Sequence, residues 1–345
     1  MKRINIVAWN NGGGLSRDVE TLVDALPRER FEISLNGAPL SASAVQPRRI
    51  VHRALNLSAA LRLRGRGMAA YYDLNLFLED ISPEFFKLAR VNAFLPNPEW
   101  FRGYMQRFLR GVDVVFCKTE HAQEIYSRLG AQTRYVGFTS DDRADPSYSG
   151  ERSTQFLHVA GRSWQKGTQA LVDVWLKHPE WPNLTVVQNA KTYSQSAVES
   201  VDAANVNHVL RRLDERELLE LQNSHAIHLC PSEVEGFGHC IVEAMSTGAL
   251  TVTTNAPPMN ELISPERGVL VDYNRTAPQR LGTNFYVDPD DLERKIGVIL
   301  AMGAFEREQL GHNARNWYLE NDRLFRSRLL GAVDDCIGPR SAVRS

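Results

Sequence analysis

The sequence predicts an α/β protein made of two doubly wound parallel-sheet domains, and two observations lead to this prediction. Short apolar runs with strand character alternate with amphipathic helical segments along most of the chain, a pattern typical of parallel sheets covered by helices on both faces. The alternation stops at a polar, turn-rich segment, residues 139–150, and then starts again. A chain of 345 residues is long enough for two domains, each with its own core.

The first half begins with an apolar run at 4–9, expected to be a strand, and a helix at 17–26 with its apolar residues on one face. The further expected elements are strands at 31–35, 74–78, 91–95, 113–117 and 133–136 and helices at 100–110 and 120–129. Together they define an N-terminal domain at 1–145.

The second half repeats this pattern. Its expected elements are strands at 154–159, 184–188, 226–230, 250–254 and 268–271 and helices at 168–177, 215–224, 239–246, 259–263 and 289–302. They define a C-terminal domain at 151–303, and residues 304–345 are expected to be helical with mixed charge.

Composition and charge exclude several classes of protein. Hydrophobic residues make up 43% and charged residues 23% of the chain, as in an ordinary soluble globular protein. A formal net charge of -1 argues against a general nucleic-acid-binding protein. No apolar run approaches the length of a membrane span, and the first apolar stretch is too short for a signal peptide, so a cytoplasmic protein is expected. The four cysteines lack Cys-x-x-Cys spacing and are expected to be reduced.

The most informative segment, residues 231–245, places two carboxylates around a glycine-rich turn. Glu235 precedes the sequence Gly-Phe-Gly, and Glu243 lies in the helix expected at 239–246. Held in the loop, Glu235 could accept hydrogen bonds from sugar hydroxyls, while Glu243 could bind the two hydroxyls of a ribose with its paired oxygens. A solvated role is the alternative for a helix glutamate.

The same turn predicts an anion site. Backbone N–H groups around Phe237, Gly238 and His239 are expected at the N-terminus of that helix, where the positive end of the helix dipole adds to their effect. Gly236 and Gly238 also allow the backbone to come close to a ligand. A phosphate could therefore bind without a cationic side chain, although a plain connection is the alternative for such a turn.

A second loop, residues 161–167, follows the first expected strand of the second domain. It carries Arg162 and Lys166, which are expected to project into a cleft near the helix expected at 239–246. A cation pair at this place could stabilise the negative charge that grows on a diphosphate as a sugar bond breaks. For either residue alone, a solvated surface turn is the alternative.

The two glutamates with seven residues between them, bracketing Gly-Phe-Gly and followed by Ala-Met-Ser-Thr-Gly-Ala, resemble the Glu-x7-Glu signature of retaining glycosyltransferases of the GT-B fold. The Gly-Arg and Lys-Gly of residues 161–167 also match these group 1 glycosyl transferases in order and spacing. The resemblance covers residues 155–275 and is only topological in the first domain.

This resemblance implies two Rossmann-like domains facing a cleft, with the C-terminal helices crossing back to the first domain. It implies transfer of a sugar from a UDP- or GDP-sugar to a hydroxyl of a glycan or lipid-linked acceptor, with retention of configuration, as in polysaccharide biosynthesis. No tightly bound cofactor is implied, and no Asp-x-Asp or His/Cys cluster suggests a metal site. A phosphorylase or an epimerase of the same fold is the alternative enzyme, and the short chain and the lack of a cofactor-lysine motif argue against the phosphorylase.

Two further segments gain a role from the resemblance. Gly13 and Gly14 follow the first strand, where the family places glycines beside the transferred sugar, although a flexible connection is the alternative. Leu213 and Arg211 precede the helix expected at 215–224, where the family's backbone borders the nucleobase; helix capping by Asp214 is the alternative.

The first domain departs from the family pattern because no histidine stands at the ends of its strands. Glu79, Asn97 and Glu99 occupy these places and are candidates for acceptor contacts, and either glutamate could take a proton from the acceptor hydroxyl. A turn at Asn97 and a helix cap by Glu99 are the structural alternatives. The missing histidines also leave open a non-catalytic nucleotide-sugar-binding protein of the same fold.

The densest basic region runs from Arg48 to Arg66, with leucines between the arginines. It could lie against anionic lipid at the inner membrane face or hold a charged acceptor. A solvated loop and helix is the alternative.

Overall fold

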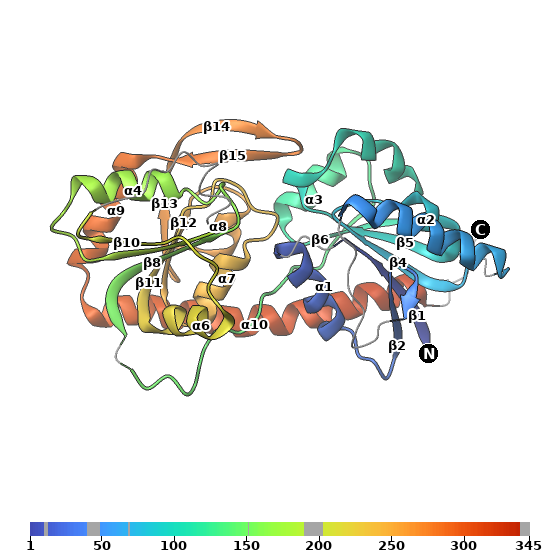
Figure 1. Cartoon of the computed structure of the whole chain (residues 1–345), viewed down its shortest axis with the longest axis horizontal. Coiled ribbons are helices and arrows are strands. Elements are labelled where there is room, and N and C mark those ends of the chain that lie inside the picture. Colours follow the sequence, from blue (N-terminus) through green and yellow to red (C-terminus); the bar gives the residue numbers. More distant parts are fainter. Residues whose placement is uncertain (10–12, 40–48, 68–69, 151, 190–202, 339–345) are drawn as a thin grey trace. The chain divides into compact units, whose positions relative to one another are not determined.

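The computed structural model describes residues 1–9, 13–39, 49–67, 70–150, 152–189 and 203–338. The chain forms two compact units (Figure 1). Unit 1 comprises Met1–Phe138 and Asp322–Ser345, and unit 2 comprises Thr139–Asn321.

Unit 1 contains a seven-stranded sheet in the order β3-β2-β1-β4-β5-β6-β7. Its pairs are parallel except for the antiparallel pair of β2 and β3. The strands are β1 (Lys2–Val7), β2 (Phe31–Leu35), β3 (Ala38–Pro39), β4 (Tyr72–Leu78), β5 (Ala89–Leu95), β6 (Val114–Cys117) and β7 (Thr133–Tyr135). The helices are α1 (Gly14–Ala25), α2 (Arg49–Gly65) and α3 (Glu120–Arg128), with 3-10 helices η1 (Pro83–Leu88), η2 (Pro98–Trp100) and η3 (Gly103–Gly111).

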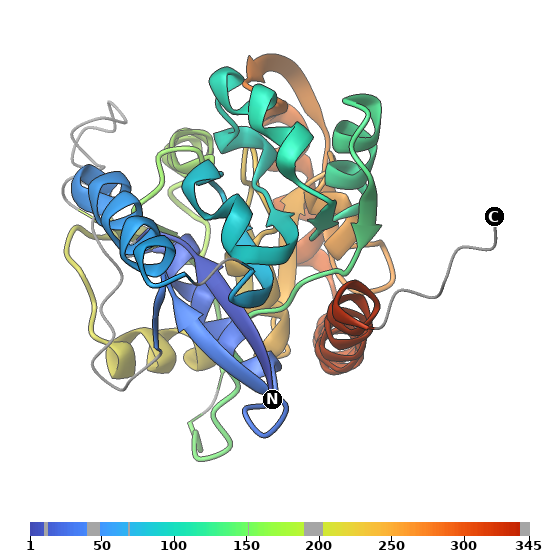
Figure 2. The ribbon, with the colours of Figure 1, turned by 90° about the vertical axis from the view of Figure 1, so that its right-hand side faces the viewer.

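The sequence explains most of these elements. The central strands β4, β5 and β6 are mostly apolar and largely buried, as expected for parallel strands between helices. The Thr119 side chain caps α3 by accepting a hydrogen bond from the Ala122 N–H at 3.1 Å. On one face of the sheet α2 packs beside η1 (Figure 2), where the amide of Asn56 donates to the Ser82 hydroxyl at 3.1 Å.

The α-helix predicted at 100–110 is wrong. The segment forms η2 and η3 instead, and Met105 is the only buried residue of η3. A segment that buries so little apolar surface gains little from packing, and the glycines at its two ends weaken an α-helix further.

Unit 2 contains a six-stranded, fully parallel sheet in the order β10-β9-β8-β11-β12-β13. The strands are β8 (Ser153–Gly161), β9 (Leu184–Gln188), β10 (Val206–Val209), β11 (His225–Cys230), β12 (Leu250–Thr254) and β13 (Val269–Val271). The helices are α4 (Thr168–Lys177), α6 (Glu215–Ser224), α7 (His239–Ser246), α8 (Met259–Leu262), α9 (Pro289–Ala301) and α10 (Ala304–Ile337). Residues of the long helix α10 are divided between the two units.

The core of unit 2 is aliphatic around one buried tryptophan. Trp175 is fully buried, and its ring meets those of Phe156 and Trp181 edge-on at centroid distances of 5.0 and 5.1 Å. The predicted cap of α6 is confirmed: Asp214 accepts from the Glu217 N–H at 2.8 Å, and the Glu217 carboxylate accepts from the Asp214 N–H at 2.9 Å.

A two-stranded antiparallel hairpin between β13 and α9 was not predicted. It consists of β14 (Tyr273–Gln279) and β15 (Gly282–Val287). Most residues of β14 are exposed, so the strand lacks the apolar alternation by which strands are recognised in a sequence.

None of the described helices is both long and apolar enough to cross a membrane.

Candidate functional site

The candidate site of unit 2 is built where the order of its strands reverses. The adjacent strands β8 and β11 lead, at their carboxyl ends, into the loop that carries Lys166 and the loop that carries Glu235. In doubly wound sheets, ligands bind outside the carboxyl ends of the strands at this reversal point. The two loops therefore stand where the topology expects a ligand.

Lys166 and Glu235 form an ion pair across these loops. Their side chains are 15% and 11% exposed. Burial alone would lower the pKa of Lys166, but the charges of Cys240 and Glu235 outweigh it and raise this pKa above its ordinary value. The lysine is thus a charged cation held beside a carboxylate, and the structure brings these two predicted residues together.

Cys240 completes this cluster and was not predicted. Its Sγ lies 3.4 Å from Lys166 Nζ and 3.6 Å from Glu235 Oε1. A hydrogen bond from the Cys230 thiol and the charge of Lys166 lower the pKa of Cys240, while the same hydrogen bond and burial raise that of Cys230. Cys240 is therefore the thiol with more thiolate character in this pair.

Local geometry explains why two positions in these loops, Gly167 and Gly238, are glycines. Gly167 has a φ of 69°, and a Cβ there would lie 2.2 Å from the carbonyl oxygen of Pro231. Gly238 has a φ of 113°, and a Cβ there would lie 2.8 Å from the side chain of Leu262. The backbones of the two loops approach each other so closely at Gly167 that no side chain fits.

Glu243 lies on α7 and is only 4% exposed. Its Oε2 accepts from the side-chain amide of Gln222 on α6, 3.4 Å away. Gln222 in turn accepts a 2.8 Å hydrogen bond from Arg143 Nε, and Arg143 also pairs with Glu215. Glu243 is thus part of a buried network.

His239, the first residue of α7, forms a hydrogen bond through Nδ1 with the hydroxyl of Ser140. Its ring meets that of Phe237 edge-on at 5.6 Å. The Ser140 carbonyl accepts from the hydroxyl of Tyr318 on α10 at 3.0 Å. Ser140, in the segment 139–150 that was predicted to be a linker, thus contacts the N-terminus of α7.

The other predicted residues of unit 2 lie at its surface. Arg162 is exposed on the loop after β8. Leu213 is half-buried in the turn before α6. The guanidinium of Arg211 makes two hydrogen bonds, of 2.8 and 2.6 Å, to the carboxylate of Glu217, so its charge is engaged beside the helix cap.

A buried polar cluster occupies the carboxyl ends of three neighbouring strands in unit 1. Lys118, after β6, donates to Asp18 on α1 at 2.5 Å and to the side-chain carbonyl of Asn97 at 2.9 Å. Lys118 and Asp18 are 2% and 3% exposed in this ion pair. Glu79, after β4, has a φ of 59° and is hydrogen-bonded to Asn97; burial and the charge of Asp18 raise its pKa to about 7.

The cluster brings together Glu79 and Asn97, two of the candidates for acceptor contacts, with Asp18 and Lys118, which were not among the predicted site residues. Asp18 is one helical turn into α1, and its pairing with a lysine a hundred positions away leaves no local sequence signal. Glu99 is 5% exposed within η2, where its charge acts on Tyr126. It lies inside a 3-10 turn and therefore does not cap an α-helix starting at Trp100.

Gly13 and Gly14 begin α1 at the carboxyl end of β1. The Gly13 carbonyl accepts from the N–H groups of Ser16 and Arg17 at 3.0 and 3.2 Å. The preceding glycine of this predicted turn, Gly12, lies outside the described residues.

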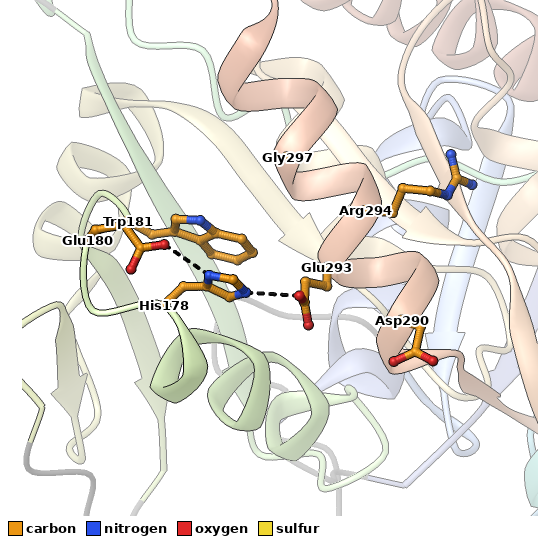
Figure 3. Close-up of a pocket in the computed structure, with 7 residues that line it drawn as sticks. All are labelled: His178, Glu180, Trp181, Asp290, Glu293, Arg294 and Gly297. Atoms are coloured by element: carbon orange, nitrogen blue, oxygen red, sulfur yellow. Dashed lines mark hydrogen bonds and ion pairs between the residues drawn. The ribbon is translucent and has the colours of Figure 1, made fainter.

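A cavity of about 510 Å³ lies elsewhere on unit 2, on the side of the sheet where β9 begins (Figure 3). Its lining residues are His178, Glu180, Trp181, Asp290, Glu293, Arg294 and Gly297. The His178 ring stacks on Trp181 at 4.1 Å, and its two nitrogens lie 2.9 and 3.0 Å from Glu180 and Glu293. None of the predicted site residues lines this cavity.

Within the described ranges, no group of three or more His, Cys, Asp or Glu side chains is arranged to hold a metal ion. Lys166 and the N-terminus of α7 both contribute positive charge to the site in unit 2.

The two doubly wound parallel sheets define the class of this protein, the GT-B fold. The chain is similar to solved structures over nearly its full length. Sucrose-phosphate synthase from Thermosynechococcus elongatus has a TM-score of 0.76 at 15% identity, with 97% of this chain and 99% of that chain covered. HepE from Anabaena in complex with UDP and glucose has a TM-score of 0.70 at 14% identity, with coverage of 97% and 100%. A structure described as trehalose-6-phosphate from E. coli bound with UDP-2-fluoro glucose has a TM-score of 0.64 at 11% identity, covering 98% and 99%.

The family follows from the sequence itself. The chain belongs to the family glycosyl transferases group 1, whose model matches residues 141–317, just over half of the chain. The matched range includes the loops of Lys166 and Glu235 and the whole of α7. No curated protein matches the sequence.

Proposed function

We propose that the protein transfers a sugar from a nucleoside-diphosphate sugar to a hydroxyl of a glycan or lipid-linked acceptor, with retention of configuration. The Lys166–Glu235 ion pair at the reversal point of the unit 2 sheet carries this proposal. A charged lysine beside a carboxylate and a helix N-terminus matches a ligand with both phosphates and sugar hydroxyls. Because two of the similar structures contain UDP or a UDP-sugar, we favour a UDP-sugar over a GDP-sugar as donor.

In this proposal the diphosphate binds at the N-terminus of α7, near Phe237, Gly238 and His239, with Lys166 as its buried cation. Arg162, exposed on the same loop as Lys166, adds a second positive charge. As the sugar bond breaks, negative charge grows on the leaving phosphate oxygen, and a cation already in place stabilises it without reorganisation.

The remaining roles follow the chemistry of each group. Glu235 accepts hydrogen bonds from the hydroxyls of the transferred sugar, and Glu243, on α7, binds the two hydroxyls of the ribose with its paired oxygens. Leu213 borders the nucleobase, and Gly13 and Gly14 border the transferred sugar. The leaving phosphate itself assists removal of the acceptor proton, so the protein mainly supplies position and charge.

The polar cluster of unit 1 supports an acceptor-binding role for this part of the chain, proposed as residues 1–145, while 151–303 hold the donor. A buried carboxyl with a pKa of about 7, as in Glu79, suits exchange of a proton with a hydroxyl near neutral pH. Asn97 orients this carboxyl through a hydrogen bond, and Glu99 stands on the next turn of the chain.

The experiment is an assay of donor hydrolysis and of transfer to glycan and lipid extracts with a panel of UDP- and GDP-sugars. Glu235→Gln and Lys166→Met are expected to lower transfer by about 100-fold or more, the size of effect seen when a group that stabilises transition-state charge is removed. Glu220→Gln and Lys295→Met make the same chemical changes at residues away from the loops and should leave transfer unchanged. Full activity of both site variants would reject the assignment.

The second candidate function is a non-catalytic nucleotide-sugar-binding protein, favoured by the carboxylate and amide that stand at the strand ends of unit 1 in place of histidines. Thermal-shift measurements separate the two, since a ligand that binds the folded state raises the melting temperature by mass action. A shift with UDP-sugar and no turnover with any acceptor would decide for the binding protein.

We also propose that this protein is cytoplasmic and contacts the inner face of the membrane, where a lipid-linked acceptor would lie. On α2, Leu57 and Leu61 are 51% and 56% exposed, and Arg62 and Arg64 lie exposed in its last turns; Arg48 lies outside the described residues. Exposed leucines next to arginines suit the boundary of an anionic bilayer. Replacing Arg62, Arg64 and Arg66 by Gln should weaken binding to anionic vesicles, and unchanged binding would remove this part of the proposal.

A further inference from the structure

The β14–β15 hairpin is attached to both loops of the candidate donor site. The N–H of Phe285, on β15, donates to the carbonyl of Glu233 at 2.7 Å. The N–H of Glu233 donates to the carbonyl of Gln165 at 3.0 Å. The side-chain amide of Gln165 donates to the side-chain oxygen of Asn284, back on β15, at 3.0 Å. Three hydrogen bonds thus close a ring through the hairpin and the two loops.

The ring is buried, which makes its bonds hard to replace. Gln165 and Asn284 are 2% and 5% exposed. A buried amide that loses its hydrogen-bond partner is not compensated by water, so the loss of this bond destabilises the arrangement. The side chains of these two residues therefore hold the hairpin and the loop of Lys166 in one arrangement.

The ring adjoins the charged pair of the site. Gln165 directly precedes Lys166, and Glu233 stands two residues before Glu235. A shift of either ring residue would move the backbone from which its charged neighbour extends. The relative position of the ammonium and the carboxylate is thus coupled to the position of β15.

The hairpin is held by the buried face of β15, where Phe285 and Val287 are 9% and 5% exposed, and by the hydrogen bonds of the ring. In the part of the chain that the structure describes, β14 and β15 form a sheet only with each other, and β14 is largely exposed. An isolated two-stranded hairpin is at best marginally stable in water. A short loop would suffice to join β13 to α9, so the hairpin needs a reason beyond connection.

We propose that the β14–β15 hairpin is a positioning element of the donor site, in which Asn284 acts through Gln165 to hold Lys166 in place against Glu235. This inference rests on the proposed function for its catalytic consequence. Asn284 is a positioning residue, because its contact is with Gln165 and Tyr286 and not with the charged pair.

The structural half of the inference is tested by hydrogen–deuterium exchange in the full-length protein without donor. Asn284→Ala should speed exchange of the Glu233 and Phe285 amides and of the peptides that cover residues 161–167. Asn274→Ala, the same change at an exposed residue of β14, should leave these rates unchanged. Faster exchange confined to 273–287 in Asn284→Ala would overturn the inference.

The catalytic half is tested by donor kinetics of Asn284→Ala, Gln165→Ala and the double variant. Misplacing a catalytic group by about 1 Å can cost about 100-fold, so kcat/KM for the donor should fall at least tenfold in each single variant. The double variant should have a kcat/KM no lower than that of the less active single variant, because both changes break the same hydrogen bond. A purely structural role predicts a lower melting temperature with unchanged kcat/KM per folded molecule, and that result would overturn the inference.

The two failures are distinguishable. If the wild-type protein neither binds nor transfers any sugar nucleotide, the proposed function fails, while the exchange experiment still decides whether the hairpin fixes the loop of Lys166. If the wild type is active and Asn284→Ala matches Asn274→Ala in both experiments, the proposed function stands and the inference fails.

Discussion

Acidic pH is expected to destabilise unit 2 through His158, a buried imidazole within the framework of the candidate site. His158 lies on β8; its Nδ1 is 2.8 Å from the carbonyl oxygen of Leu229 on β11, and its Nε2 is 2.8 Å from the hydroxyl of Thr168. Burial lowers the pKa of His158 to about 4. The neutral ring can donate from Nδ1 and accept at Nε2, which satisfies both contacts.

The size of the effect follows from the two pKa values. In the unfolded chain a histidine has a pKa of about 6.5. Below that pH the unfolded chain binds a proton that the folded protein does not take up until the pH reaches about 4, so the free energy of unfolding falls as the pH falls through this window. A difference of about 2.5 units, at about 1.4 kcal/mol per unit, amounts to a loss of about 3 kcal/mol between pH 7 and pH 4.

Urea denaturation of the wild type and of His158→Gln at pH 7 and pH 4 measures this loss. Glutamine keeps a donor and an acceptor but does not titrate, so the free energy of unfolding of the wild type should drop by about 3 kcal/mol more than that of the variant. Burial also lowers the pKa of His228, to about 3, but His228 is present in both proteins, so its contribution to the pH dependence of unfolding cancels in the comparison. An equal drop in the two proteins would refute the reasoning.

Three further predictions test other parts of the structure. Gly167→Ala should cost about 2 kcal/mol or more in thermal or urea unfolding, because the new methyl group meets the Pro231 carbonyl at a left-handed φ; an unchanged stability would contradict the close approach of the loops. Alkylation of Cys240 with iodoacetamide should abolish transfer and be slowed by donor, since its Sγ lies 3.4 Å from Lys166 Nζ; an equally sensitive Cys240→Ser variant would place the reactive thiol elsewhere. Glu79→Gln should stabilise the protein relative to wild type at pH 8 but not at pH 4, because the folded state holds the proton of Glu79 up to about pH 7; a pH-independent difference in urea unfolding would count against this pKa.

The fold could be predicted because its strands are buried on both faces. The predicted segment 113–117 is apolar after its first residue, and 74–78 is apolar except for Asn75; the structure places β6 and β4 there, with 114–117 and 74–78 buried. Elements that bury little were missed or mistaken: β14 is exposed, and η3 buries only Met105. Periodicity reports burial, so it fails where an element is held by a few specific hydrogen bonds.

The site was predictable only where its chemistry is local in the sequence. The spacing of Glu235 and Glu243 and the order of residues in the loop of Lys166 indicated these groups. Asp18, which pairs with Lys118, and Asn284, which holds Gln165, are single polar residues whose partners lie about a hundred positions away. No periodicity or spacing connects such pairs, and only the topology of the sheets brings them together.

The ion pair of Lys166 and Glu235 also bears on which anions can compete for the proposed donor site. A lysine without a nearby counter-charge attracts phosphate, sulfate and many metabolites alike, whereas Lys166 has a counterion supplied by its own chain. A bare inorganic anion would have to displace that carboxylate, which is only 11% exposed, and would leave it as a buried charge without its cation. A nucleotide sugar can replace both partners, offering phosphate to the ammonium and hydroxyls to the carboxylate. In the proposed donor site, the pair would therefore favour a ligand with both phosphate and hydroxyl groups over simple inorganic anions.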